Sequence, residues 1–207
     1  MSQNPDSCFQ QHRFERALSL FDAANAADPN LEEIGGQLRP KELLYAERMS
    51  EMLQRFAPDA NEAVKLAVRA QHIKRWTVPR NTYPMTPEGY KAWRSGLYKF
   101  HAETAGALMR EAGYDEAMAE QVGRIVAKKG IKVNDDSQLL EDIASLVFLE
   151  HYLSAFAAQH PEYDEAKWCG IIRKTWQKMS ARARDFALLG HITLPVDLTP
   201  LIVKAIT

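Results

Sequence analysis

The chain has 207 residues, of which 46% are hydrophobic and 26% charged, proportions typical of a globular protein with one domain of moderate size. Its formal net charge of −1 excludes a nucleic-acid binder that depends on a large basic excess, although it permits a local basic pocket. No apolar run reaches the roughly 18–20 residues of a membrane-spanning helix, and the N-terminus lacks a secretory signal. The two cysteines, Cys8 and Cys169, suggest neither a disulfide framework nor a zinc motif, so we expect a cytoplasmic protein.

The N-terminal part of the chain predicts a tail followed by helices. Residues 1–12 are polar and aperiodic and predict a disordered tail, after which residues 13–207 form a single all-α domain. An apolar helical stripe ends near Pro29, and residues 29–38, which contain a Gly-Gly pair, predict a loop. Pro40 suits the first turn of a second helix, and a third follows it.

The segment Ala67–Arg80 changes character within a few residues. It begins as an apolar helical pattern and then carries a histidine, two cations and a tryptophan ahead of a proline. His72, Arg75 and Trp76 are spaced i, i+3 and i+4, so we expect them to share one helical face. A packed helix that ends in such a polar cluster is typical of a functional site.

The C-terminal part predicts further helices and no sheet. Residues 77–89 contain four helix breakers and predict a structured loop. Helices are predicted at about 87–112, 115–128, 137–158 and 164–188, the third being the most apolar and therefore the most buried, with a short one near the C-terminus. Without strand alternation, internal repeats or a composition shift, we expect an all-α bundle of about seven to nine helices.

Three residues on separate predicted helices could bind a metal ion: His72, His101 and Asp142. His101 shares a helical face with apolar residues and should point inward. Asp142 lies in the most apolar helix, where a carboxylate needs a cation, a metal or several hydrogen bonds, and its neighbour Glu141 is expected to face solvent. Such a set suits a metal site in a helical bundle, and a buried hydrogen-bond network is the alternative.

Basic and aromatic residues near these positions favour an anionic ligand. Arginine binds phosphate oxygens in bidentate fashion, and an aromatic ring can stack on a base. Surface salt bridges are the alternative interpretation for each cation. The predicted ligand contacts are Arg48, Arg75, Trp76, Arg80, Tyr83, Arg94, Arg173 and Lys174.

The order of helices and polar residues resembles the HD superfamily of metal-dependent phosphohydrolases. Ala70–Ile73 stands where that family has A-x-x-H-D, Leu140–Ala144 resembles its late aspartate motif, and His101–Ala105 stands where many members carry a polar stretch. The resemblance implies metal-ligand roles for His72 and Asp142. The chain departs from the pattern where Tyr45 replaces the first metal histidine and Ile73 replaces the aspartate of the H-D pair.

A closer resemblance, over nearly the whole chain, is to domain-of-unknown-function family 4202, which implies no established activity. The motifs that carry it are P-K-E-L-L-Y-A-x-R-M, A-Q-H-I-x-R-W, Y-P-M-T, F-H-A-E-T-A-G, L-E-D-x-x-x-L-V-F-L-E and R-K-T-W-x-K-M-S. Here they stand at Pro40–Met49, Ala70–Trp76, Tyr83–Thr86, Phe100–Gly106, Leu140–Glu150 and Arg173–Ser180.

These patterns lead to one main hypothesis and two alternatives. The main hypothesis is a hydrolase of small, nucleotide-like phosphate esters that uses a divalent metal ion (Mn, Fe, Co, Zn or Mg), no organic cofactor, and Glu103, Glu42 or Glu150 as general base. The first alternative is a non-catalytic ligand-binding or interaction module, and the second, ranked lowest, is a di-iron oxygenase. We expect a small anionic ligand as partner, no bulk nucleic-acid binding and no membrane, and leave an oligomer open.

Overall fold

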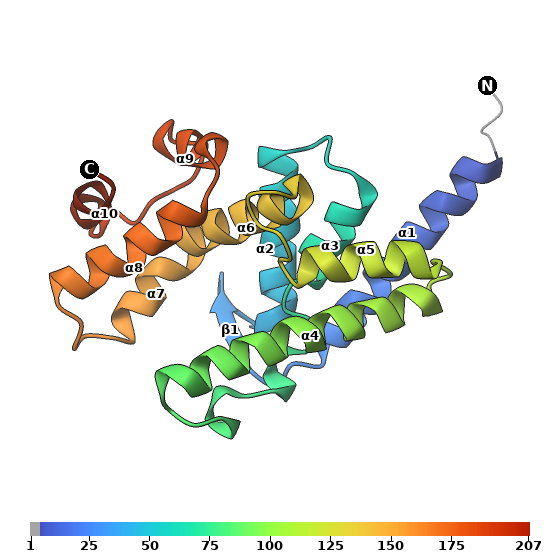
Figure 1. Cartoon of the computed structure of the whole chain (residues 1–207), viewed down its shortest axis with the longest axis horizontal. Coiled ribbons are helices and arrows are strands. Elements are labelled where there is room, and N and C mark those ends of the chain that lie inside the picture. Colours follow the sequence, from blue (N-terminus) through green and yellow to red (C-terminus); the bar gives the residue numbers. More distant parts are fainter. Residues whose placement is uncertain (1–4) are drawn as a thin grey trace.

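The computed structural model describes residues 5–207 and confirms the all-α prediction (Figure 1). Its described residues form ten α helices, more than the expected seven to nine, because two of the predicted helices are each divided in two. The helices are α1 (Pro5–Ala26), α2 (Lys41–Phe56), α3 (Glu62–Ala70), α4 (Pro87–Glu111), α5 (Glu116–Val126), α6 (Asp135–Val147), α7 (Leu153–Ala158), α8 (Glu165–Lys178), α9 (Ala181–Leu188) and α10 (Thr199–Ile206).

Helix α1 begins earlier than the sequence pattern suggested. It starts at Pro5, so residues 5–12 of the expected tail are helical, and residues 1–4 lie outside the described residues. None of the helices in the described part of the chain combines the length and apolar character needed to cross a membrane.

The loop predicted at residues 29–38 is in fact mostly a β hairpin. Strands β1 (Leu31–Ile34) and β2 (Gln37–Pro40) pair antiparallel, with Ile34 opposite Gln37. Gly35 and Gly36 between them have φ angles of 58° and 78°, which glycine adopts without steric cost in a two-residue hairpin turn. The strands were missed because each has four residues and none of them is fully buried, so no alternating pattern arises.

The core forms where α2, α3 and α6 contact one another, and α5 packs against both α3 and α6. Helix α4 packs along α5 at one side of the molecule, while α8 pairs with α10 at the end away from the N-terminus (Figure 1). The largest fully buried side chains in this core include Met52, Leu66, Met109, Leu146 and Leu149.

The helix predicted at 137–158 contains a π-helical turn, η3 (Phe148–Tyr152), between α6 and α7. Its first part lies deep in the core, and Leu140, Ile143 and Leu153 are fully inaccessible to solvent, whereas most of α7 is only partly buried or exposed. A π turn adds one residue to the helix and changes the face that the following side chains present, and such turns are common at functional sites.

The segment that begins at Ala67 does not continue as one helix. Helix α3 ends at Ala70, and Lys74 takes a left-handed conformation with φ 51° before the 3₁₀ turn η1 (Arg75–Thr77). The backbone N–H of Lys74 donates to Asn25 of α1, which fixes this change of direction. His72, Arg75 and Trp76 therefore do not share an α-helical face, and their contacts depend on the turn.

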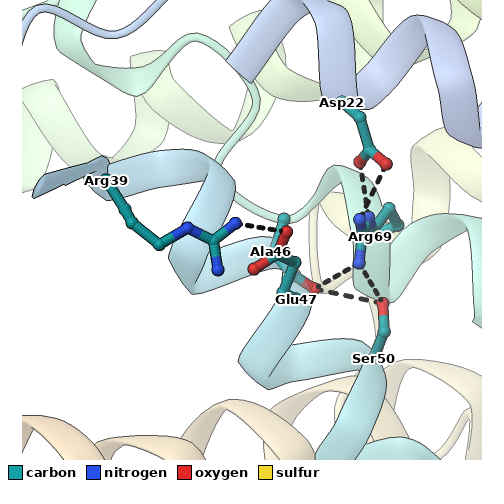
Figure 2. Close-up of polar contacts among 6 residues, drawn as sticks. All are labelled: Asp22, Arg39, Ala46, Glu47, Ser50 and Arg69. Carbon is teal, nitrogen blue, oxygen red and sulfur yellow. Dashed lines mark hydrogen bonds and ion pairs between the residues drawn. The ribbon is translucent and has the colours of Figure 1, made fainter. Parts of the chain in front are cut away.

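Arg69 anchors the end of α3 that leads into this turn. Figure 2 shows its guanidinium between Asp22 of α1 and Ser50 of α2. The Nε and Nη2 groups donate to the two oxygens of Asp22 at 2.6 and 2.7 Å, a bidentate geometry that is stronger and more directional than a single ion contact. Three helices are thus joined immediately before His72.

Candidate functional site

A cavity of about 820 Å³ lies beside the turn that follows α3. Most of the side chains in its lining are basic, acidic or aromatic, and they come from β1, α2, α4, the stretch from α6 to α7, and the segments that follow α3 and α5. The polar and aromatic side chains that line it include Glu32, Lys41, Glu42, Tyr45, Gln71, His72, Arg75, Tyr90, Trp93, Arg94, Tyr98, His101, Lys128, Phe148, Tyr152 and Phe156.

His72 is held on one wall of the cavity by contacts with three side chains. Tyr45 stacks on its ring at a centroid distance of 4.1 Å and an interplanar angle of 12°. The His72 Nδ1 atom lies 3.4 Å from Glu42 Oε2 and 3.4 Å from Arg75 Nη1. Burial, and then the charge of Arg75, lower the pKa of His72 well below its usual value, so the ring is neutral at pH 7.

His101 reaches the same cavity from the middle of α4, and its ring centroid lies 6.0 Å from that of His72. Its Nδ1 atom is 2.9 Å from the main-chain oxygen of Ile73, which can only accept, so Nδ1 carries the proton. Burial lowers the pKa of His101 to about 3. The ring is therefore neutral and its Nε2 atom is an acceptor, which makes no hydrogen bond with any described residue.

Glu42 is the carboxylic acid of the cavity whose pKa is shifted most clearly. Burial raises the pKa of its carboxyl group to about 7, although the nearby charge of Arg75 acts in the opposite direction. A carboxyl group with this pKa can accept or release a proton near neutral pH, as a general base or acid requires. Of the three predicted general bases, Glu42 is the one that lines the cavity.

Two arginines of the cavity lack acidic partners among the described residues. Arg75 lies 5.3 Å from the centre of the Trp93 ring, and Arg94 donates to the Tyr98 hydroxyl at 2.5 Å. Neither forms a salt bridge with any residue in the described range, whereas Arg48 pairs with Glu32 at 2.8 Å. Arg75 and Arg94 thus bring positive charge to the cavity that no carboxylate of the described chain directly neutralises.

Asp142 has a structural role at a different place. Its Oδ1 atom accepts from the Ser180 N–H at 2.7 Å and from the Gln138 amide at 2.9 Å, and its Oδ2 atom accepts from the Ser180 hydroxyl at 2.5 Å. Since Ser180 is the N-cap of α9, these bonds fix the start of that helix. The predicted trio with His72 and His101 is not brought together, and within residues 5–207 no three His, Cys, Asp or Glu side chains could hold a metal ion.

The other two predicted general bases lie outside the cavity. Glu103 is largely exposed, faces Lys99 at 3.8 Å, and lines a separate groove between α4 and α5. Glu150 forms a 2.8 Å salt bridge with Arg55 and accepts from the Thr193 N–H at 2.8 Å. On α4, Glu103 follows His101 by two residues, a spacing that directs the two side chains to nearly opposite sides of the helix.

Several predicted ligand contacts also lie elsewhere. Arg80 donates to the carbonyl oxygens of Tyr83, Pro84 and Thr86, so it stabilises the loop ahead of α4. Arg173 and Lys174 are exposed on α8, and neither they nor Trp76 line the cavity. Arg48 packs over the Tyr152 ring at 5.0 Å and is engaged by Glu32. The aromatic lining is instead formed by Tyr45, Tyr90, Trp93, Tyr98, Phe148, Tyr152 and Phe156.

Neither the place of Lys128 in the site nor the burial of its partner Glu141 was predicted from the sequence. Lys128 lines the cavity and forms a buried 2.5 Å ion pair with Glu141, which was expected to face solvent and is 5% exposed. Lys128 follows α5 in a left-handed conformation with φ 52°, which for a lysine is uncommon and marks a constrained position. The only sequence feature that could have indicated a buried Glu141 was the position of this acid within the most apolar predicted helix.

The fold and the cavity together define an all-α protein with a basic and aromatic pocket built around two neutral histidines and a glutamate. The chain belongs to the family described as Domain of unknown function (DUF4202), whose model matches residues 15–202. Neither a curated protein nor a solved structure gives a significant match.

Proposed function

We propose that the protein binds a small phosphorylated ligand in the cavity lined by Arg75 and Arg94. The observation that carries the proposal is that these two guanidinium groups line a single cavity without forming salt bridges to described carboxylates. Lys41 and Lys128 add positive charge to the lining, and Lys128 already has Glu141 as a partner. Guanidinium groups bind phosphate oxygens through paired hydrogen bonds, which suits a ligand with a terminal phosphate.

The aromatic part of the lining supports a ligand that also carries a planar ring. Phe148 and Tyr152 of the π turn and Phe156 of α7 supply aromatic surface in the same cavity. Stacking on such side chains is favourable for any base and needs no specific hydrogen bond. A nucleotide combines both groups, so nucleotide-like phosphates are the ligands to test first.

Arg75→Ala and Arg94→Ala should each weaken binding of adenosine 5′-monophosphate by about tenfold or more, because each removes a charge-assisted hydrogen bond to phosphate. Isothermal titration calorimetry at constant salt measures this, and Arg173→Ala on α8 is the matched control, with affinity within about twofold of the wild type. If the wild type bound neither this nucleotide nor inorganic phosphate, or if the two cavity variants matched the control, the proposal would be wrong.

A second candidate function, hydrolysis of the bound phosphate ester, is favoured by Glu42. Its carboxylate could take a proton from a water molecule as the water oxygen bonds to phosphorus and the ester P–O bond breaks, and then return that proton to the leaving alkoxide. Arg75 and Arg94 would stabilise the charge on the phosphoryl oxygens. The predicted metal ligands His72, His101 and Asp142 are not brought together in the described part of the chain.

The pH dependence of hydrolysis tests this role of Glu42. The base must be ionised, so kcat should rise with pH and reach half its maximum near pH 7, where burial places the pKa of Glu42. Glu42→Gln should lower kcat by about 10²–10⁴-fold and abolish the rise of kcat with pH. Glu103 is an exposed acid outside the cavity, so Glu103→Gln should have the kcat and pH profile of the wild type. Phosphate release from adenosine 5′-monophosphate is the assay.

The two candidate functions separate cleanly in these experiments. Binding that depends on Arg75, without phosphate release at any pH, would leave a non-catalytic ligand-binding module. Hydrolysis that persists in Glu42→Gln would exclude Glu42 as the base even if the ligand is correct.

A further inference from the structure

The cavity concentrates buried polar atoms that lack hydrogen-bond partners. Such atoms are rare in folded proteins because each costs about 1–3 kcal/mol when left unpaired. Of the five side-chain atoms of this kind in the described residues, three belong to residues that line the cavity: Gln71 Oε1, His101 Nε2 and Tyr152 Oη. The other two, on Arg13 and Asn25, belong to residues outside its lining.

The unpaired atom of His101 has a defined chemical character. The Nδ1 proton is engaged by the Ile73 carbonyl oxygen, so the lone pair is on Nε2, and the buried ring does not become protonated near neutral pH. The residue is 3% exposed, and its partner must be a hydrogen-bond donor. Gln71 Oε1 is a second acceptor, on a residue that is 5% exposed. The Tyr152 hydroxyl can donate or accept.

A phosphate dianion cannot satisfy these acceptors, because its oxygens also accept. An ammonium group could donate, but Arg75 and Arg94 close by would repel it. A hydroxyl group donates without carrying charge. The path from Arg75 to His101 is short, with a 3.4 Å Arg75–His72 contact and a 6.0 Å distance between the His72 and His101 rings, so one small molecule can carry both the phosphate and the hydroxyl.

We propose that the ligand is a hydroxylated phosphate ester, such as a sugar phosphate or a nucleotide with free ribose hydroxyls, and that His101 Nε2 accepts a hydrogen bond from one of those hydroxyls. Gln71 and Tyr152 supply further partners for the polyol. This inference rests on the proposed phosphate-binding function and adds the class of ligand that the cavity selects. His101 is a specificity-determining residue in this arrangement.

Two ligand pairs that differ only in hydroxyl groups test the inference: glycerol 3-phosphate against propyl phosphate, and adenosine 5′-monophosphate against its 2′,3′-dideoxy analogue. The wild type should bind the hydroxylated member of at least one pair about tenfold more tightly, since the deoxy member leaves a buried acceptor unpaired. His101→Phe, which keeps a ring but has no acceptor, should bring that ratio close to one. His101→Gln, which can still accept, should restore part of it.

A measurement on the unmodified protein covers the case in which the His101 variants do not fold. The ¹⁵N chemical shift of His101 Nε2 should move on addition of the hydroxylated ligand and stay in place with its deoxy analogue. If the wild type binds both members of each pair equally and the shift does not respond, the inference is wrong although the phosphate-binding proposal stands. If no phosphate compound binds at all, both are wrong.

Discussion

Ile73→Asp is expected to destabilise the protein by about 4 kcal/mol or more, and not to complete a histidine–aspartate metal pair. Ile73 follows His72 in sequence, yet its side chain is fully buried in the hydrophobic core. An aspartate there would place an ionised carboxylate among apolar side chains or force it to remain protonated. Its carboxylate would also be directed into the core, away from the cavity that His72 lines.

Urea unfolding followed by circular dichroism measures this change. Ile73→Val is the matched control and should cost only about 0.5–1.5 kcal/mol, since it removes one methyl group without adding charge. An Ile73→Asp protein that is as stable as the valine variant and binds one equivalent of Mn²⁺ or Fe²⁺ would overturn the prediction and support the metal-dependent hypothesis.

Glu141→Gln should lower the free energy of unfolding by about 3–5 kcal/mol, because it leaves the buried ammonium group of Lys128 without its charged partner. The two groups are 2.5 Å apart, and both side chains are less than a tenth exposed. Lys128→Met should cost less, since Lys178 lies 3.6 Å from Glu141 and can still neutralise it. Glu120→Gln, which removes an exposed partner of Arg124, is the control and should stay within about 0.5 kcal/mol of wild type.

The acid dependence of the same variant gives an independent check. Burial alone would raise the pKa of Glu141, but the charges of Lys128 and Lys178 hold it below its usual value. A depressed pKa in the folded state contributes stability above the unfolded pKa, and that contribution is lost as pH falls through the folded value. The stability gap between wild type and Glu141→Gln should therefore narrow as the solution is acidified below about pH 4. A gap that is constant with pH would contradict the buried ion pair.

Helical periodicity predicted much of the architecture, because the buried stripes of α2, α5 and α6 repeat at the spacing of an α helix. It could not predict where a helix changes its geometry. The π turn at Phe148–Tyr152 stands inside an apolar stretch that reads as one continuous helix, and the division between α8 and α9 falls at Ser180, which caps α9 and donates to Asp142 of α6.

The sequence predicted some of the polar residues of the candidate site, but not all of the contacts they make. His72, His101 and Arg75 stand out because polar groups interrupt apolar helical patterns, and these residues do meet in the cavity. The same reasoning selected Asp142, whose partner proved to be Ser180 of a distant segment. Local pattern identifies a buried polar group, whereas the identity of its partner depends on tertiary contacts that a single sequence does not contain.

The hydrogen bond between His101 and Ile73 makes the tautomer of His101 independent of which apolar side chain stands at position 73. The group that fixes the proton on Nδ1 is a main-chain carbonyl, which every amino acid supplies. Replacing Ile73 with another apolar residue would change core packing and leave the tautomer of His101 unaltered. Position 73 thus needs an apolar side chain that fits the core, while the main chain keeps the tautomer of His101 whichever apolar residue stands there.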